Sequence, residues 1–188
     1  MTKNKIKPFS SLSAAAKRIA IAEDILKQIK AKQYNIESGT WLNINPVDME
    51  ENLKNTTKAE MLQNVLLGGK HAVIMEAPPA KCTCCAVGAA CASAIRLFNQ
   101  DSLRGSPKYG YEIARYSEGI KILNKYFPLA QVDLMEAAFE MRTDTHHKHA
   151  NQADIDDAVK FGEEYNYDTD RLVAICKNII KNKGNFKP

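Results

Sequence analysis

The sequence lacks any long apolar run. Its longest stretch of uncharged, mostly small residues lies between Lys81 and Arg96, and this stretch is too short and too polar to cross a bilayer. The N-terminus carries Lys3, Lys5 and Lys7, but no apolar segment of the kind found in signal peptides follows them. We therefore expect a protein that is neither membrane-spanning nor secreted.

The sequence also lacks a spaced disulfide framework. Cysteine occurs five times, and four of the five cysteines fall within residues 82 to 91. Small secreted domains instead spread an even number of cysteines along the chain. The crowding is therefore typical of a protein that works in a reducing cytosol.

Signatures of catalysis are the third absence. The chain contains no Gly-x-Ser-x-Gly, His-Glu-x-x-His or Gly-x-Gly-x-x-Gly motif. The segment Gly68-Gly69-Lys70-His71 is not a phosphate loop, because His71 stands where that motif needs a hydroxyl residue. No catalytic residue is assigned, and the sequence favours a protein that is not an enzyme.

Amphipathic helical patterns make up most of what is there. The 188 residues, with a net charge of +4 and 45% hydrophobic residues, predict one globular domain. We expect a mainly α, single-domain helical bundle of about six helices over residues 11–188, preceded by a basic N-terminal arm at 1–10. At most a short two-stranded β element is expected, from residues 40–44 and 72–75. The expected helices include 11–34, 83–98, 111–126, 153–165 and 168–183, and Gly184 is expected to end the last.

The cysteine cluster allows two interpretations. Cys82 and Cys85 form a C-x-x-C pair at the expected start of a helix, and they could supply half of a zinc site whose other half is His146 and His149. The alternative is structural. The helix at 83–98 consists largely of Ala, Gly, Ser and Cys, and such small residues let neighbouring backbones approach closely. Close packing accounts for more of these residues, and zinc remains the alternative.

A nucleotide or other signalling molecule is a possible ligand of the chain. Its phosphate and base would be contacted by a set of cationic and aromatic residues, namely Lys70, His71, Arg104, Lys108 and Tyr109. A binder of this kind would sequester its ligand within a homo-oligomer.

Charge is distributed unevenly along the chain. Residues 1–33 hold eight Lys or Arg against two Asp or Glu, whereas residues 131–164 hold three Lys or Arg against nine Asp or Glu. Opposite patches favour head-to-tail association of copies, or docking of the basic N-terminal region on an acidic partner, including a nucleic acid or nucleotide. The simpler interpretation is a pair of solvated helix faces.

The stretch Lys81-Cys-Thr-Cys-Cys-Ala-Val-Gly-Ala resembles the C-x-x-C-A-x-G-A signature of a family of small, uncharacterised proteins of tailed bacteriophages. Cys82, Cys85, Ala86, Gly88 and Ala89 match it, and blocks beginning at residues 18, 135 and 171 are similar to the same family. Cys84 and Cys91 depart from the bare signature. The resemblance implies a phage protein, located in the host cytoplasm or in the virion, and carries no activity with it.

These observations favour a non-enzymatic phage accessory protein that acts through protein–protein contacts. It would be a virion component or an inhibitor of a host factor, working as a homo-oligomer or with another phage or host protein. The nucleotide binder and a zinc-dependent protein using Cys82 and Cys85 are the alternatives.

Overall fold

A computed structural model of the chain describes residues 12–45, 81–98, 116–143 and 148–188. Their elements are α1 (Ala14–Lys30), β1 (Tyr34–Ile36), β2 (Leu42–Asn45), β3 (Lys81–Cys84), α3 (Ala86–Phe98), α4 (Tyr116–Leu123), α5 (Leu129–Glu140), α6 (Gln152–Glu163) and α7 (Asp168–Lys181). The predicted mainly helical fold with a small β element is confirmed, although the sheet has three strands rather than two. Within the described ranges no helix is long and apolar enough to span a membrane.

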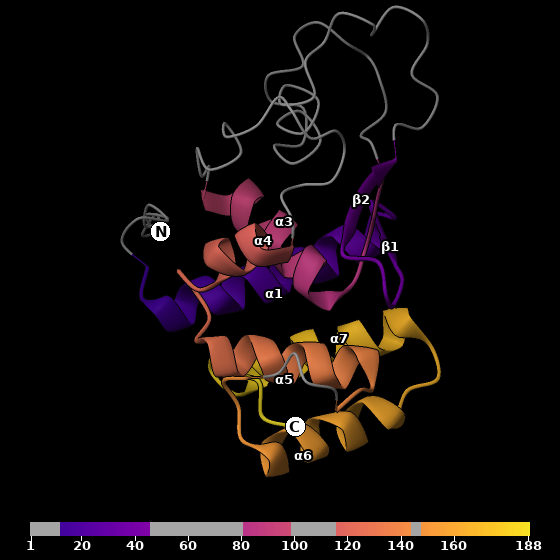
Figure 1. The fold of residues 1–188 in the computed structure, drawn as a ribbon. Helices are drawn as coiled ribbons and strands as arrows, with labels where there is room; N and C mark the ends of the chain where they lie inside the picture. The colour runs from indigo at the N-terminus through magenta and orange to yellow at the C-terminus, as the bar shows by residue number, and fades with distance from the viewer. Residues whose placement is uncertain (1–11, 46–80, 99–115, 144–147) are drawn as a thin grey trace, which may run out of the picture.

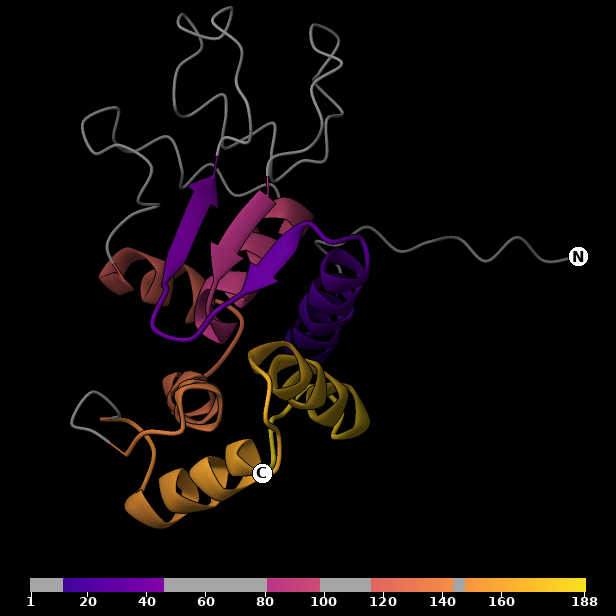
Figure 2. The same cartoon turned by 90° about the vertical axis from the view of Figure 1, so that its right-hand side faces the viewer.

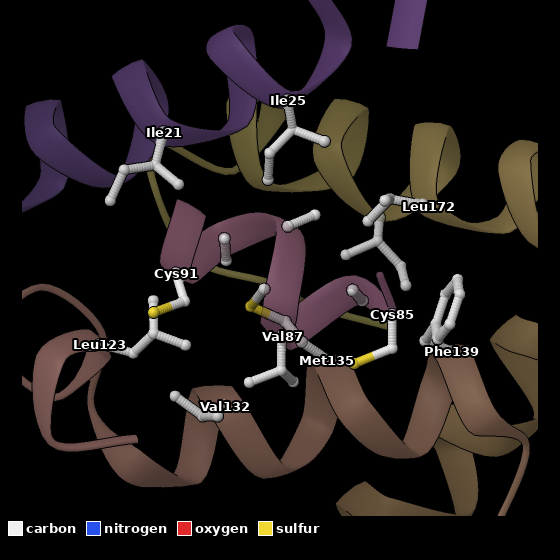
Figure 3. Packing of buried hydrophobic residues seen from close by; sticks show 14 of the residues in the cluster. Ile21, Ile25, Cys85, Val87, Cys91, Leu123, Val132, Met135, Phe139 and Leu172 are labelled. Atoms are coloured by element: carbon white, nitrogen blue, oxygen red, sulfur yellow. The ribbon is translucent and has the colours of Figure 1, made fainter. Parts of the chain in front are cut away.

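Helix α3 lies at the centre of the molecule. Its residues from Val87 to Ala94 are buried on every side, which only a helix of small residues allows without pushing its neighbours away. Ile21 and Ile25 of α1 lie on one side of α3, and Leu123, Val132 and Met135 lie on the other (Figure 3). The close packing expected for this stretch is confirmed.

The sheet corrects one expectation. Residues 83 and 84, expected at the start of a helix, belong instead to the central strand β3, which pairs parallel with β1 and antiparallel with β2. The helix begins only after Cys85, whose N–H donates to the carbonyl of Thr40 at 2.6 Å. Backbone pairing with distant segments therefore overrides the local helical preference of the stretch. The segment 72–75, expected to pair with 40–44, lies outside the described residues.

The observed helix ends follow local chemistry. Ser13 caps α1 by accepting the N–H of Ala16, and Asn151 caps α6 by accepting the N–H of Asp154. At the end of α7 the N–H of Gly184 donates to the carbonyl of Ile179, as in a Schellman motif. Lys183, with φ of 55°, directly follows the cap residue Asn182, and Gly184, with φ of 92°, is one position later than expected.

The C-terminal residues are anchored to the bundle. Phe186 is buried, and its backbone N–H and carbonyl bind the side-chain amide of Gln131 at 2.5 and 3.1 Å. Arg18 of α1 donates to the carbonyl of Tyr126 and to the side-chain oxygen of Asn185, both at 3.1 Å. Helix α1, the α4–α5 connection and the C-terminal residues thus form one packed unit, with α1 and α7 side by side (Figures 1 and 2).

Trp41 explains two glycines. A Cβ on Gly88 would lie 1.7 Å from the carbonyl oxygen of Trp41, and a Cβ on Gly119 would lie 2.0 Å from its indole ring. The backbone of Trp41 therefore lies against α3 and its ring lies against α4. Both contacts are so close that only glycine, which has no Cβ, fits at residues 88 and 119.

Replacing Gly88 by Ala should lower the melting temperature, because the added methyl group must displace the Trp41 backbone. Overpacking of this kind costs about 1–3 kcal/mol. Thermal unfolding followed by circular dichroism measures the effect. The control is Ala153→Leu at an exposed position of α6, which should leave the transition nearly unchanged. Equal melting temperatures for Gly88→Ala and the parent chain would contradict the close approach.

Candidate functional site

The cysteine cluster is part of the interior. Cys82 and Cys84 alternate with Thr83 along β3, so their side chains share one face of the sheet. Cys85 lies in the turn between β3 and α3, where its thiol donates to the carbonyl of Trp41 at 3.6 Å. All five cysteines of the chain are buried and none forms a disulfide.

Burial makes these thiols poor nucleophiles. Burial raises the pKa of Cys82 to about 11 and the pKa values of Cys85 and Cys91 to about 12, and it raises that of Cys84 well above its ordinary value. The helix-start environment expected for the Cys82–Cys85 pair, which would have lowered their pKa values, is wrong because Cys82 is a strand residue.

The four predicted zinc ligands are only partly described. Cys82 and Cys85 are buried, His149 is exposed, and His146 lies outside the described residues. His149 is held by Asp133 of α5, whose carboxylate accepts the His149 N–H at 2.6 Å and lies 3.3 Å from ring Nδ1. Across the described ranges no group of three or more metal-ligating side chains comes together. The zinc site remains an untested alternative.

The predicted nucleotide ligands are not placed. Lys70, His71, Arg104, Lys108 and Tyr109 all lie outside the described residues. The nucleotide-binding interpretation therefore stays a prediction.

Arg171, a buried residue that no sequence motif indicated, connects the start of α7 with the ends of α5 and α6. Arg171 in the first turn of α7 is 2% exposed, and its guanidinium donates to the carbonyls of Phe139 at 2.7 Å, Tyr165 at 3.0 Å and Gly162 at 3.1 Å. Phe139 and Gly162 lie in the last turns of α5 and α6, and Tyr165 lies just beyond α6, so the guanidinium is at helix C-termini, where a positive charge is favourable. The sequence signal was weak, because an arginine three residues into a helix usually faces solvent.

Two carboxylates hold the β1–β2 turn at the same end of the molecule. The N–H of Ser38 donates to Asp168 Oδ2 at 2.7 Å, and the N–H of Gly39 donates to Glu140 Oε2 at 2.9 Å. Asp168 also accepts a bond from Arg171 at 3.0 Å. The sequence predicts Asp168 or Thr169 as the cap of α7, and this prediction is wrong, because Tyr167 occupies the cap position and Asp168 binds the turn.

The negative charge of Glu140 is in an unfavourable environment. Burial raises the pKa of its carboxyl, and the negative charges of Glu136 and Asp168 act in the same direction. The Gly39 N–H and Arg142 oppose the shift without cancelling it. The ionised side chain thus serves as an acceptor for the turn while it destabilises the fold.

The surface of this end carries apolar side chains. Among the described residues the large hydrophobic side chains that are exposed are Met141, just after α5, and Tyr167, just before α7. Their exposed fractions are 41% and 72%. Together with the β1–β2 turn, these residues form the strongest candidate for a functional surface in the described part of the chain.

Comparisons of the chain with models of protein families, with curated proteins and with solved structures found no match.

The buried thiols should resist modification in the native protein. A pKa near 11 for Cys82 leaves roughly 100-fold less thiolate at pH 8 than an ordinary cysteine has, and burial slows reagent access further. Reaction with Ellman's reagent should therefore be slow until denaturant is added, while a Lys177→Cys variant should show one fast-reacting thiol. Rapid native labelling of Cys82 or Cys85, identified by mass spectrometry, would show that the cluster opens.

Replacing Glu140 by Gln should change the pH dependence of stability. A carboxyl whose pKa is raised in the folded state binds its proton more tightly there, so its contribution to stability is present at low pH and is lost as pH rises through the folded pKa. Glu140→Gln should therefore be more stable than the parent at pH 7, with the difference vanishing at pH 4 and below. Urea unfolding at both pH values measures this.

The matched control for this comparison is Glu163→Gln on the exposed end of α6. It removes the same charge from a solvated position and should shift stability little at either pH. A Glu140→Gln variant that is less stable at pH 7 would show that the charge-assisted bond to Gly39 outweighs the cost of burial.

Proposed function

We propose that this chain is a non-enzymatic accessory protein of a tailed bacteriophage that acts through protein–protein contacts. It serves as a virion component or as an inhibitor of a host factor. The observation that supports the proposal best is the separation of charge on its surface.

Exposed acidic side chains predominate on α6, where Lys160 pairs with Asp157, and exposed lysines predominate on α1 and α7, which also carry Glu23 and Asp170. The acidic set is Asp154, Asp156, Asp157, Glu163 and Glu164. The basic set lies on α1, on α7 and on the residues that follow them: Lys27, Lys30, Lys32, Lys177, Lys181, Lys183 and Lys187. Helices α1 and α7 pack against each other, while α6 lies on α5 at the edge away from the sheet (Figure 2). The two charge sets therefore face different directions, which favours oriented association with a partner.

The roles of the buried polar and thiol groups also support the proposal. The thiols are enclosed around α3, Arg171 is used to bind backbone carbonyls, and Asp133 holds the backbone ahead of α6. Each of these groups has a packing or capping task. The described side chains therefore suit recognition of a partner protein by the surface of the molecule.

The phage assignment depends on the cysteine-containing signature. Its matching residues occupy the sheet centre and the start of α3, and Gly88 among them permits the contact with Trp41. Because the residues of the signature have a packing role, a family that carries it could share this fold while its members differ in their surface residues.

Native mass spectrometry of the purified full chain tests the proposal. Expected are complexes, with itself or with a protein partner, that dissociate as salt is raised, because exposed charges are screened. Spectra that contain one chain alone under every salt condition would contradict it. Stoichiometric nucleotide would instead favour the ligand-sequestering alternative, and stoichiometric zinc would favour the metal-binding alternative.

A further inference from the structure

The end of the molecule where Arg171 binds the helix ends has exposed apolar side chains with acidic residues around them. We call this surface the end face. Met141 and Tyr167 are its exposed apolar side chains, and its charged residues are Glu37, Glu140, Asp168, Asp170 and Arg142. Figure 1 shows the β1–β2 turn reaching the start of α7 at this end.

Arg171 brings together the two chain segments that carry the apolar side chains. Its guanidinium binds the carbonyls of Phe139 and Tyr165 at once, and Met141 and Tyr167 follow these residues by two positions each. Two residues extend the chain by at most about 7 Å. Met141 and Tyr167 therefore both lie at the end of the molecule where Arg171 binds.

The charge of the end face is predominantly negative. The Glu140 and Asp168 carboxylates lie on the adjacent N–H groups of the β1–β2 turn, Glu37 is exposed in that turn, and Asp170 is exposed one turn from Tyr167. The cations near them are Arg171, which is buried, and Arg142, which is exposed. A partner segment that fits this surface carries positive charges and an apolar or aromatic anchor.

We propose that the end face binds the N-terminal arm, residues 1–10, of a second copy of this chain. The arm has Lys3, Lys5 and Lys7 with the apolar residues Ile6 and Phe9 among and after them. Its lysines complement the acidic residues of the end face, and Phe9 provides an aromatic anchor for Tyr167 and Met141. This inference rests on the proposed function and names one contact through which the protein associates.

The geometry of α1 and α7 favours a second copy over the chain's own arm. Gly184, after the end of α7, lies against Ala15 at the start of α1, so the arm begins at the opposite end of α7 from Tyr167. Helix α7 is about 20 Å long, whereas the four residues from Phe9 to Ser13 span at most about 14 Å.

Electrostatic repulsion also disfavours binding of the arm to the end face of its own chain. An arm folded back along α7 would place its lysines beside Lys177, Lys181 and Lys183, all of which are exposed. Like charges at such distances repel each other. Binding in trans avoids this repulsion and brings the arm directly to the acidic end face.

Sedimentation velocity on the full chain tests the proposal. Tyr167→Ser is the variant of choice, because Tyr167 is the N-cap residue of α7 and serine is a favoured N-cap, so folding is retained. We expect association of the parent chain to weaken at least tenfold in Tyr167→Ser, and likewise in Lys3→Glu/Lys5→Glu/Lys7→Glu. Adding Glu37→Lys and Asp170→Lys to the arm variant should restore association, since both charges are then reversed.

The control is Lys121→Glu/Lys125→Glu/Lys148→Glu, which changes net charge equally at exposed positions outside both the end face and the basic set of α1 and α7. It should associate as the parent does. Association that persists unchanged in Tyr167→Ser and in the arm variant would overturn this inference and leave the proposed function standing. A parent chain that is monomeric in sedimentation yet forms complexes with another protein would overturn the inference alone, and a chain without any complex would overturn both.

Discussion

The described structure depends on one buried cation. Arg171 binds backbone carbonyls from the ends of α5 and α6 while it is itself part of α7, so three helices meet at one guanidinium. The carbonyls at helix ends lack intrahelical donors, and a delocalised cation with several N–H groups satisfies more than one of them at a time. The β1–β2 turn is fixed through the same group, because Asp168 links Arg171 to the N–H of Ser38. Loss of this cation would leave buried carbonyls unpaired and would remove one of the links between the β1–β2 turn and the helices.

The helical part of the fold could be predicted from the sequence, because helix formation is governed by near neighbours. In α7 the spacing of Leu172, Ile175, Cys176 and Ile179 predicts the buried face correctly. In α1 the predicted stripe of Ile19, Ala22, Leu26 and Ile29 is only partly right, because Ile21 and Ile25 are buried beside Ala22 while the other three are half-buried. Of the two predicted caps, Ser11 and Ser13, the structure uses Ser13. The small residues of α3 indicated close packing, and the contact between Gly88 and Trp41 is its clearest expression. In these segments the information needed to form the structure lies within a few residues.

The sheet and the end face could not be predicted in the same way. The partners of β3 are 36 to 48 residues away along the chain, and no local pattern distinguishes Lys81–Cys84 from the first turn of a helix. The role of Arg171 depends on carbonyls contributed by two other helices, so its residue type and position alone say nothing of it. The exposure of Met141 and Tyr167 likewise follows from how three helix ends meet. The cysteine cluster attracted attention by its composition, and its burial between sheet and helices follows from contacts that composition does not specify.

The order of the strands has a consequence for the way the protein is made. The central strand β3 is the last of the three along the chain, so β1 and β2 leave the ribosome before there is any strand between them. Tyr34 meets Cys82 only after a loop of nearly fifty residues has closed, which carries an entropic cost that later contacts must offset. Until α3 follows, the apolar side of α1 has none of the small-residue surface against which it packs. The sheet and the contacts of α1 with α3 therefore cannot form until β3 and α3 have been synthesised, so this part of the core assembles late.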